Sequence, residues 1–346
     1  MKIRLLTLGF LVSCSLLASA DDQRIRDYWP TSGWKLSKPE NQEMLSSHLK
    51  KMSAFVKGNL PNASNITVIR HGYIVFEENY LGDSTTLRPV ASVAKSVLSA
   101  LIGIAIRDGY IKSIDQRMVD FFPKLKKNKS NPEVDNIQIR HLLTLSDGIS
   151  KNASGIDFSR FDPTQELRAS PGKELFYNDM SPQVLSMILT DKTGLKALDF
   201  AKKYLLGPLG IGNVTWEEVN GYSIGASGLQ LTTRDLAKIG YLYLNKGKWE
   251  GKQLIPENWV IESTRSQIDA PNVPYFNIKF TYGFLWWLHS VGKYSAFSAV
   301  GWGGQYITVV PELDFVVVIT TVERMHSNAP KYLALIEDYV LPSITR

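Results

Sequence analysis

The order of the hydrophobic patterns along the chain constrains the fold most. Short runs typical of strands lie near both ends: residues 66–69 and 73–76 form a predicted hairpin, and four more runs follow residue 281. Between them, apolar residues recur every three or four positions, as in amphipathic helices. We therefore expect an α+β fold in which the terminal strands build one antiparallel sheet, flanked by helices, with an inserted helical lobe.

The expected elements are assigned by residue range. The helices are expected over 41–57, 92–108, 138–145, 181–192, 197–206, 233–245, 256–263 and about 330–340. The C-terminal strands are expected over 282–288, 294–300, 305–310 and 315–321. With 346 residues, of which 44% are hydrophobic, the chain can bury a large core.

Residues 1–20 have the layout of a secretory signal. Two basic residues precede an apolar run over 5–17 and small residues over 18–20, so the mature chain is expected to begin near Asp21 and to be periplasmic or secreted. The residues around Cys14 can instead be read as a lipoprotein cleavage site, which would anchor the protein to a membrane. Cys14 is the only cysteine, so the mature fold is expected to have no disulfide and no cysteine nucleophile.

The charge balance argues against a nucleic-acid partner. The 39 basic and 33 acidic residues give a net charge of +6, or +4 once the two basic residues of the signal are removed. The one dense basic run, 124–129, lies in a polar stretch and is expected to be a solvated loop. We expect no nucleic-acid partner, and membrane contact only through a lipidated Cys14.

A Ser-x-x-Lys pair on one helical face can supply a nucleophile and its base. The spacing alone decides little, because it occurs five times: Ser32/Lys35, Ser47/Lys50, Ser92/Lys95, Ser170/Lys173 and Ser290/Lys293. Only Ser92 begins a strongly apolar helix, whose N-terminus would favour a developing negative charge and whose core would disfavour the charged form of Lys95. The alternative, a helix-capping Ser92 with a surface Lys95, stays open on these residues alone.

Two loops carry further candidates. Tyr177 follows a turn and precedes a predicted helix, where catalytic groups often collect, although a core tyrosine would fit as well. Residues 301–304 place three glycines between two predicted strands. They would let a substrate lie against the backbone, and the N–H of Gln305 could join that of Ser92 in an oxyanion hole. An ordinary glycine-rich hairpin is the alternative.

Other motifs are interpreted as structural. Residues 221–225 fit G-x-S-x-G, but neither a buried strand nor an immediate helix flanks them. Lys192-Thr193-Gly194 and Ser146-Asp147-Gly148 are interpreted as helix ends with glycine in the cap position. The five histidines lack metal-ligand spacing, so no metal or other cofactor is expected.

Taken together, Ser92-Val93-Ala94-Lys95, the Tyr177 loop, the Gly303-Gly304 motif and the N-terminal hairpin resemble the serine β-lactamase/penicillin-binding-protein family. The sequence is most similar to its class C-like branch, which includes esterases and 6-aminohexanoate-dimer hydrolases; supporting stretches are 139–144, 228–237 and 304–307. The resemblance implies a β-lactamase/transpeptidase-like domain over 60–346 after an N-terminal extension over 21–59. Its α/β part would comprise 60–91 and 265–346, and its helical lobe 92–264.

The resemblance also implies a serine hydrolase that cleaves a small ester or amide without a cofactor. Ser92 would form the acyl-enzyme, Lys95 and Tyr177 would act as general bases, and the backbone N–H groups of Ser92 and Gln305 would bind the oxyanion.

Two departures from the family pattern bear on the substrate. Asp179 occupies the third position of the Tyr-x-Asn motif, and Trp302-Gly303-Gly304 stands where lactamases place a cation before Thr-Gly. Both changes disfavour an acidic substrate, so these residues are expected to contact esters or uncharged amides. A true β-lactamase or D-Ala-D-Ala carboxypeptidase is the alternative enzyme, and a catalytically silent cell-wall or lipid-binding protein is the alternative of another class.

Overall fold

The structure, a computed structural model, describes residues 26–122, 132–149, 167–270, 279–322 and 329–345. The predicted signal segment, with Cys14, and the basic run 124–129 lie outside these residues. Within the described ranges, no helix has both the length and the apolar character that a membrane span requires.

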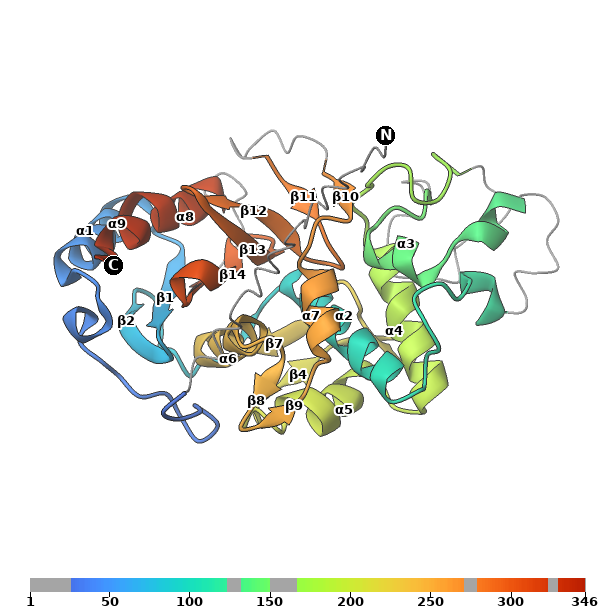
Figure 1. The fold of residues 1–346 in the computed structure, drawn as a ribbon, viewed down its shortest axis with the longest axis horizontal. Coiled ribbons are helices and arrows are strands. Elements are labelled where there is room, and N and C mark those ends of the chain that lie inside the picture. Colours follow the sequence, from blue (N-terminus) through green and yellow to red (C-terminus); the bar gives the residue numbers. More distant parts are fainter. Residues whose placement is uncertain (1–25, 123–131, 150–166, 271–278, 323–328, 346) are drawn as a thin grey trace, which may run out of the picture.

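One antiparallel sheet joins the two ends of the chain (Figure 1). Its eight strands run in the order β10-β11-β12-β13-β14-β15-β1-β2. In chain order they are β1 (Ala63–Arg70), β2 (Tyr73–Asn79), β10 (Ile268–Asp269), β11 (Thr281–Tyr282), β12 (Trp287–Val291), β13 (Tyr294–Gly301), β14 (Gln305–Val310) and β15 (Phe315–Thr321). Because β1 pairs with β15, with Val68 opposite Val317, the N-terminal hairpin extends the C-terminal meander. The expected α+β class is confirmed.

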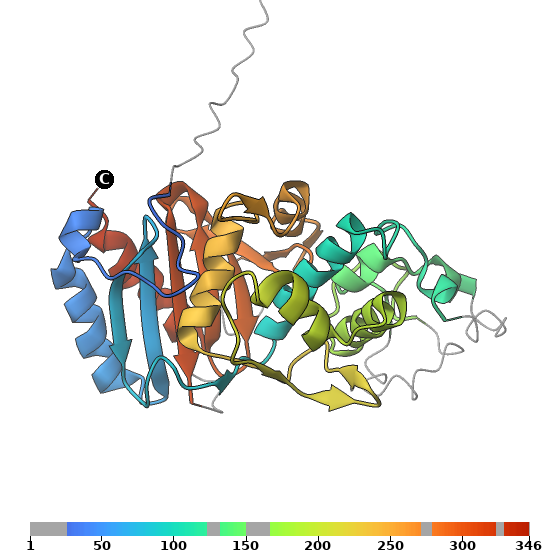
Figure 2. The same ribbon diagram turned by 90° about the horizontal axis from the view of Figure 1, so that it is seen from below.

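Both faces of this sheet are covered by helices (Figure 2). Val317 on β15 belongs to the core that includes α1 (Ser46–Asn59) and α8 (Ala329–Leu335). Its neighbour Val318 belongs to the larger core, which contains α6 (Thr233–Leu244). Successive side chains of a strand point to opposite faces, so a strand buried on both sides is apolar throughout, as Phe315–Thr321 nearly is.

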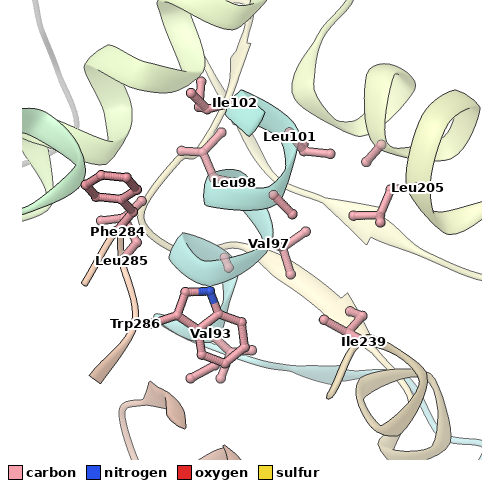
Figure 3. Packing of buried hydrophobic residues seen from close by; sticks show 14 of the residues in the cluster. Val93, Val97, Leu98, Leu101, Ile102, Leu205, Ile239, Phe284, Leu285 and Trp286 are labelled. Carbon is pink, nitrogen blue, oxygen red and sulfur yellow. The ribbon is translucent and has the colours of Figure 1, made fainter. Parts of the chain in front are cut away.

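Helix α2 (Val93–Arg107) runs through the larger core, and every residue from 93 to 105 is buried. Figure 3 shows Leu98 facing the segment that carries Phe284, and Leu101 facing Leu205. Truncating such a fully buried leucine typically costs about 2–5 kcal/mol of stability. The first turn of α2 is therefore held firmly by the packing of the rest of the helix.

The remaining α-helices and small sheets lie mainly around α2, except for α9, which contacts α1. They are α3 (Ile139–Leu143), α4 (Met180–Thr193), α5 (Ala197–Ala201), α7 (Glu257–Ser263) and α9 (Leu341–Ser343), with a π-helical turn after each of α5 and α8. The small sheets are β3-β7-β4 (Arg88–Pro89, Leu229–Leu231, Thr215–Trp216), β5-β6 (Glu218–Val219, Tyr222–Ser223) and β8-β9 (Lys248–Trp249, Lys252–Gln253).

The strand predicted over 282–288 is wrong. β11 ends at Tyr282 and β12 begins at Trp287, and between them Gly283 N donates to Trp286 O at 2.9 Å. Leu285 has φ +61°, so the chain turns there. The apolar residues 284–286 pack into the core beside α2 instead of pairing in the sheet (Figure 3), and a short apolar run fits both structures.

The two predicted helix ends behave differently. Gly194 caps α4 with φ +71°, as expected. Gly148 does not cap α3, because that helix ends at Leu143 and its C-cap is Thr144. The side chain of the preceding residue, Asp147, accepts a hydrogen bond from the N–H of Ile149, so this motif is a turn built on a buried carboxyl group.

Candidate active site

Ser92 and Lys95 lie together at the start of α2. Ser92 is the N-cap residue, although its side chain makes no capping hydrogen bond. The Lys95 Nζ donates to Ser92 Oγ at 2.9 Å. Because Lys95 is only 1% exposed, the alternative of a capping serine and a surface lysine does not describe the structure.

Three oxygen atoms surround the Lys95 amine. Besides Ser92 Oγ, it donates to Asp179 Oδ1 at 2.8 Å and to Ala226 O at 3.0 Å. The carboxylate and the carbonyl only accept hydrogen bonds, so each takes one hydrogen whether the nitrogen carries two or three. The remaining tetrahedral position of the nitrogen faces Ser92. The arrangement therefore allows a single proton to pass between Ser92 and Lys95.

Asp179 connects the two helices that meet here. It is the N-cap residue of α4, its carboxylate forms an ion pair with Lys95, and its side chain is 54% exposed. The sequence predicted a substrate-facing charge at this position. The structure places that charge against Lys95 as well as at the surface of the site.

Tyr177 lies on the loop before α4, beside the same amine. The Lys95 Nζ is 4.9 Å from the centroid of the Tyr177 ring. The ring stacks on Trp287, with centroids 5.6 Å apart and an interplanar angle of 24°. Tyr177 remains partly exposed, whereas burial holds the pKa of the nearby Tyr282 well above its ordinary range. Of these two phenols, Tyr177 is the one that reaches solvent.

The end of β13 packs closely against the residues just before Ser92. Gly301 lies opposite Gln305 of β14, and a Cβ added at Gly301 would lie 2.4 Å from Val90 O. Both ends of the Gln305 side-chain amide hydrogen-bond to Thr321 on β15, with 2.7 Å from Nε2 to Oγ1 and 3.1 Å from Thr321 N to Oε1. Only the backbone of Gln305 is thus left to contribute to the site.

Trp302, Gly303 and Gly304 form the turn between β13 and β14. Trp302 is 45% exposed. Gly303 and Gly304 have φ of +83° and +107°, which favour glycine, so both also serve the conformation of the turn. The Gly303 carbonyl accepts from Thr321 Oγ1 at 3.0 Å, which ties the turn to β15.

Two residues at the site were not predicted. Ala226 contributes only a carbonyl oxygen, which no sequence motif marks. Trp287 was assigned to a strand, but nothing in the sequence indicated that its ring would support Tyr177. By contrast, Ser223 of the G-x-S-x-G motif is fully buried, and its Oγ accepts from Leu198 N at 3.3 Å. This position does not suit a nucleophile elbow.

The sheet with helices on both faces, and the serine and lysine that open a buried helix, define the β-lactamase/transpeptidase class of folds. The sequence model of the Beta-lactamase family matches residues 50–336, and the chain belongs to this family.

The chain is also similar in sequence or in fold to individual proteins. The chain is 24% identical over 258 residues to a 6-aminohexanoate-dimer hydrolase of Paenarthrobacter ureafaciens, a match that covers 66% of this chain and 64% of that protein. It also resembles the octameric penicillin-binding protein homologue of Pyrococcus abyssi, with a TM-score of 0.69, 19% identity and coverage of 85% and 77% of the two chains. EstCE1, a hydrolase with promiscuous acyltransferase activity, gives a TM-score of 0.70 at 14% identity, covering 85% of this chain and 98% of its own.

Proposed function

We propose that the protein is a serine hydrolase that cleaves an ester or amide bond through an acyl-enzyme on Ser92. The observation that carries the proposal is the 2.9 Å contact between Ser92 Oγ and the buried Lys95 Nζ. A serine hydroxyl is a weak nucleophile until an adjacent base accepts its proton. Membership of the Beta-lactamase family and the hydrolases among similar proteins support the same reaction class.

In the proposed acylation, neutral Lys95 accepts the Ser92 proton while Oγ bonds to the substrate carbonyl carbon. The carbonyl oxygen becomes an oxyanion, which the N–H groups of Ser92 and Gln305 would bind; the N-terminus of α2 adds favourable potential. When the bond to the leaving group breaks, Tyr177 gives that group a proton and regains one from Lys95. The Lys95 Nζ lies 4.9 Å from the centroid of the Tyr177 ring, and this proximity supports including Tyr177 in the reaction.

In deacylation, a water molecule attacks the acyl carbon and gives its proton to Tyr177 as Tyr177 passes its own proton to neutral Lys95. The Ser92–acyl bond then breaks, Ser92 recovers its proton, and the acid product leaves. One difficult hydrolysis is thereby divided into two easier steps that use the same groups.

The proposed substrates are esters or uncharged amides with a compact acyl part. Trp302 offers an exposed aromatic face where a cation would bind a carboxylate. Asp179 is half exposed at the site and would repel an acidic substrate, because the Lys95 beside it is neutral in the proposed acylation. Trp302 and Asp179 would therefore both favour a substrate without a negative charge. The predicted signal over 1–20 supports a location outside the cytoplasm.

The test uses a fluorophosphonate probe on the purified chain from residue 21 onward. We expect the probe to label the wild type and Ser47→Ala but not Ser92→Ala. Ser47 is the matched control because it has the same spacing to a lysine, lies on helix α1 and is exposed. Absence of labelling in the wild type, without turnover, would favour a silent binding protein. Faster turnover of a chromogenic cephalosporin than of short p-nitrophenyl esters would favour a β-lactamase.

A further inference from the structure

The loop that carries Tyr177 and Asp179 rests on a buried cluster that the proposed reaction does not use. Asp147 is 1% exposed and Ser181, in the first turn of α4, is fully buried. The Ser181 Oγ lies 2.5 Å from Asp147 Oδ2 and 2.8 Å from Asn178 Oδ1. The three side chains thus form a continuous hydrogen-bonded chain at the base of this loop.

Two further contacts fix the orientation of the Asn178 amide. Its Nδ2 donates to Phe176 O at 2.9 Å, and its Oδ1 accepts from Ser181 N at 2.8 Å. Exchanging the amide oxygen and nitrogen would place donor against donor and acceptor against acceptor. The atom facing the Ser181 hydroxyl is therefore an oxygen that has no hydrogen to give.

The hydrogens of this chain can be counted. Its two oxygen–oxygen contacts need one hydrogen each, and the Ser181 hydroxyl supplies only one. The other Asp147 oxygen, Oδ1, accepts from Ile149 N at 2.9 Å, which leaves Oδ2 as the place for the missing hydrogen. An ionised Asp147 would also be a buried charge, and the structure gives it no ion pair within the described residues.

We propose that Asp147 is a neutral carboxylic acid in the folded protein, and that its O–H begins a donor chain through Ser181 to Asn178 that positions Tyr177 and Asp179 beside Lys95. Asp147 is a positioning residue, because it acts through Ser181. The positioning rests on the proposed function, whereas the protonation of Asp147 does not.

The surroundings of Asp147 agree with a neutral acid. Burial is the largest effect on its carboxyl group and raises the pKa, whereas the side chains of Ser181 and Asn178 and the N–H groups of Ile149 and of Asp147 itself act in the opposite direction. The titratable groups on the described segments packed around it include Arg140 and His141 on α3, Arg168, Lys173 and Glu174 before the loop, and the Lys95–Asp179 pair beyond it. None of these side chains hydrogen-bonds to the Asp147 carboxyl.

The protonation is tested by urea unfolding of the wild type and Asp147→Asn between pH 5 and 8. An asparagine can accept from Ile149 and donate to Ser181 but has no proton to lose. An unfolded aspartate is ionised above about pH 3.9, so the stability from a neutral Asp147 is complete below that pH and is lost as the pH rises. We expect the wild-type unfolding constant to rise up to about tenfold per pH unit relative to the variant. Parallel curves would overturn the proposal.

Burial lowers the pKa of His141, but this residue is present in both proteins and its effect cancels in the comparison. If Asp147→Asn does not fold, ¹³C NMR of carboxyl-labelled aspartates replaces it. We expect a resonance of a neutral acid near pH 6 that Ser181→Ala displaces and Ser186→Ala does not. Absence of such a resonance would also overturn the proposal.

The positioning is tested by Ser181→Ala against Ser186→Ala. Ser186 is the matched control, because it is fully buried on the same helix and donates to Ser223 O at 2.7 Å, away from the loop. A displacement of about 1 Å can cost 10²-fold in rate, so we expect kcat to fall by about 10- to 100-fold in Ser181→Ala, with KM little changed and Ser186→Ala near the wild type. Equal losses in both variants would overturn the positioning. A wild type without turnover or Ser92 labelling would refute the proposed function and leave the unfolding comparison to decide the protonation.

Discussion

A single methyl group at Gly301 tests whether the end of β13 must lie against the residues before Ser92. In Gly301→Ala the new Cβ would lie 2.4 Å from Val90 O, while ordinary contacts begin near 3.4 Å. The backbone of Gly301 does not require glycine, since its φ is not positive. The substitution therefore acts through the close contact alone, and the strand end must move by about 1 Å.

The expected cost follows from that displacement. A shift of about 1 Å at a catalytic geometry can cost 10²-fold in rate, or about 2.7 kcal/mol in the activation free energy. Overpacking of this kind also lowers stability by about 1–3 kcal/mol. We expect kcat/KM for a p-nitrophenyl ester to fall about 100-fold in Gly301→Ala, with slower labelling of Ser92, while circular dichroism shows a folded protein with a lower melting temperature.

The control is Gly58→Ala, the same change on the exposed side of α1, where an added Cβ meets nothing within 4 Å. Because the added Cβ meets no other atom, this variant should keep wild-type turnover. It should also be slightly more stable, because alanine is favoured over glycine inside a helix. A folded Gly301→Ala enzyme with turnover within about twofold of the wild type would refute the close packing of β13 on Val90.

Three further predictions concern other parts of the molecule. Lys95→Ala should lower ester turnover by several powers of ten, while Lys50→Ala should not; equal rates in the two would remove Lys95 from the mechanism. Trp302→Lys should shift the ratio of kcat/KM towards carboxylate-bearing substrates, and an unchanged ratio would exclude Trp302 from specificity. Burial lowers the pKa of His289, so its stabilising contribution is present above about pH 6.5 and is lost as the pH falls. The free energy of unfolding in urea should fall between pH 7.5 and pH 5 by more in the wild type than in His289→Gln. The difference should be at most about 1.4 kcal/mol per pH unit, and equal losses in the two proteins would contradict the prediction.

The features predicted well from the sequence are those that depend on local periodicity. The apolar pattern after Ser92 predicts α2 and brings Lys95 to the same face, because residues three apart on a helix are neighbours. Val316, Val317 and their neighbours predict a buried strand, since the run is continuous and rich in β-branched residues. The order of these elements along the chain was enough to predict that strands from both ends of the chain form one sheet.

Tertiary contacts could not be predicted in the same way. The carbonyl of Ala226 reaches Lys95 because of how the loop before β7 packs, and every residue has such a carbonyl. The motif position of Asp179 suggested a charge directed at the substrate, but its ion pair with Lys95 depends on where α4 begins relative to α2. Similarly, the run 284–286 is equally apolar as a strand or as a buried turn, and only its packing beside α2 decides between them.

The pairing of β1 with β15 has a consequence for the newly made protein. Ser92 and Lys95 are synthesised well before Gly301 and Gln305. The hairpin β1-β2 cannot join the rest of the sheet until β15 has been made. A nascent or truncated polypeptide thus possesses the hydroxyl and the amine without the surface that completes their surroundings. The site can therefore be completed only after β15 has been made.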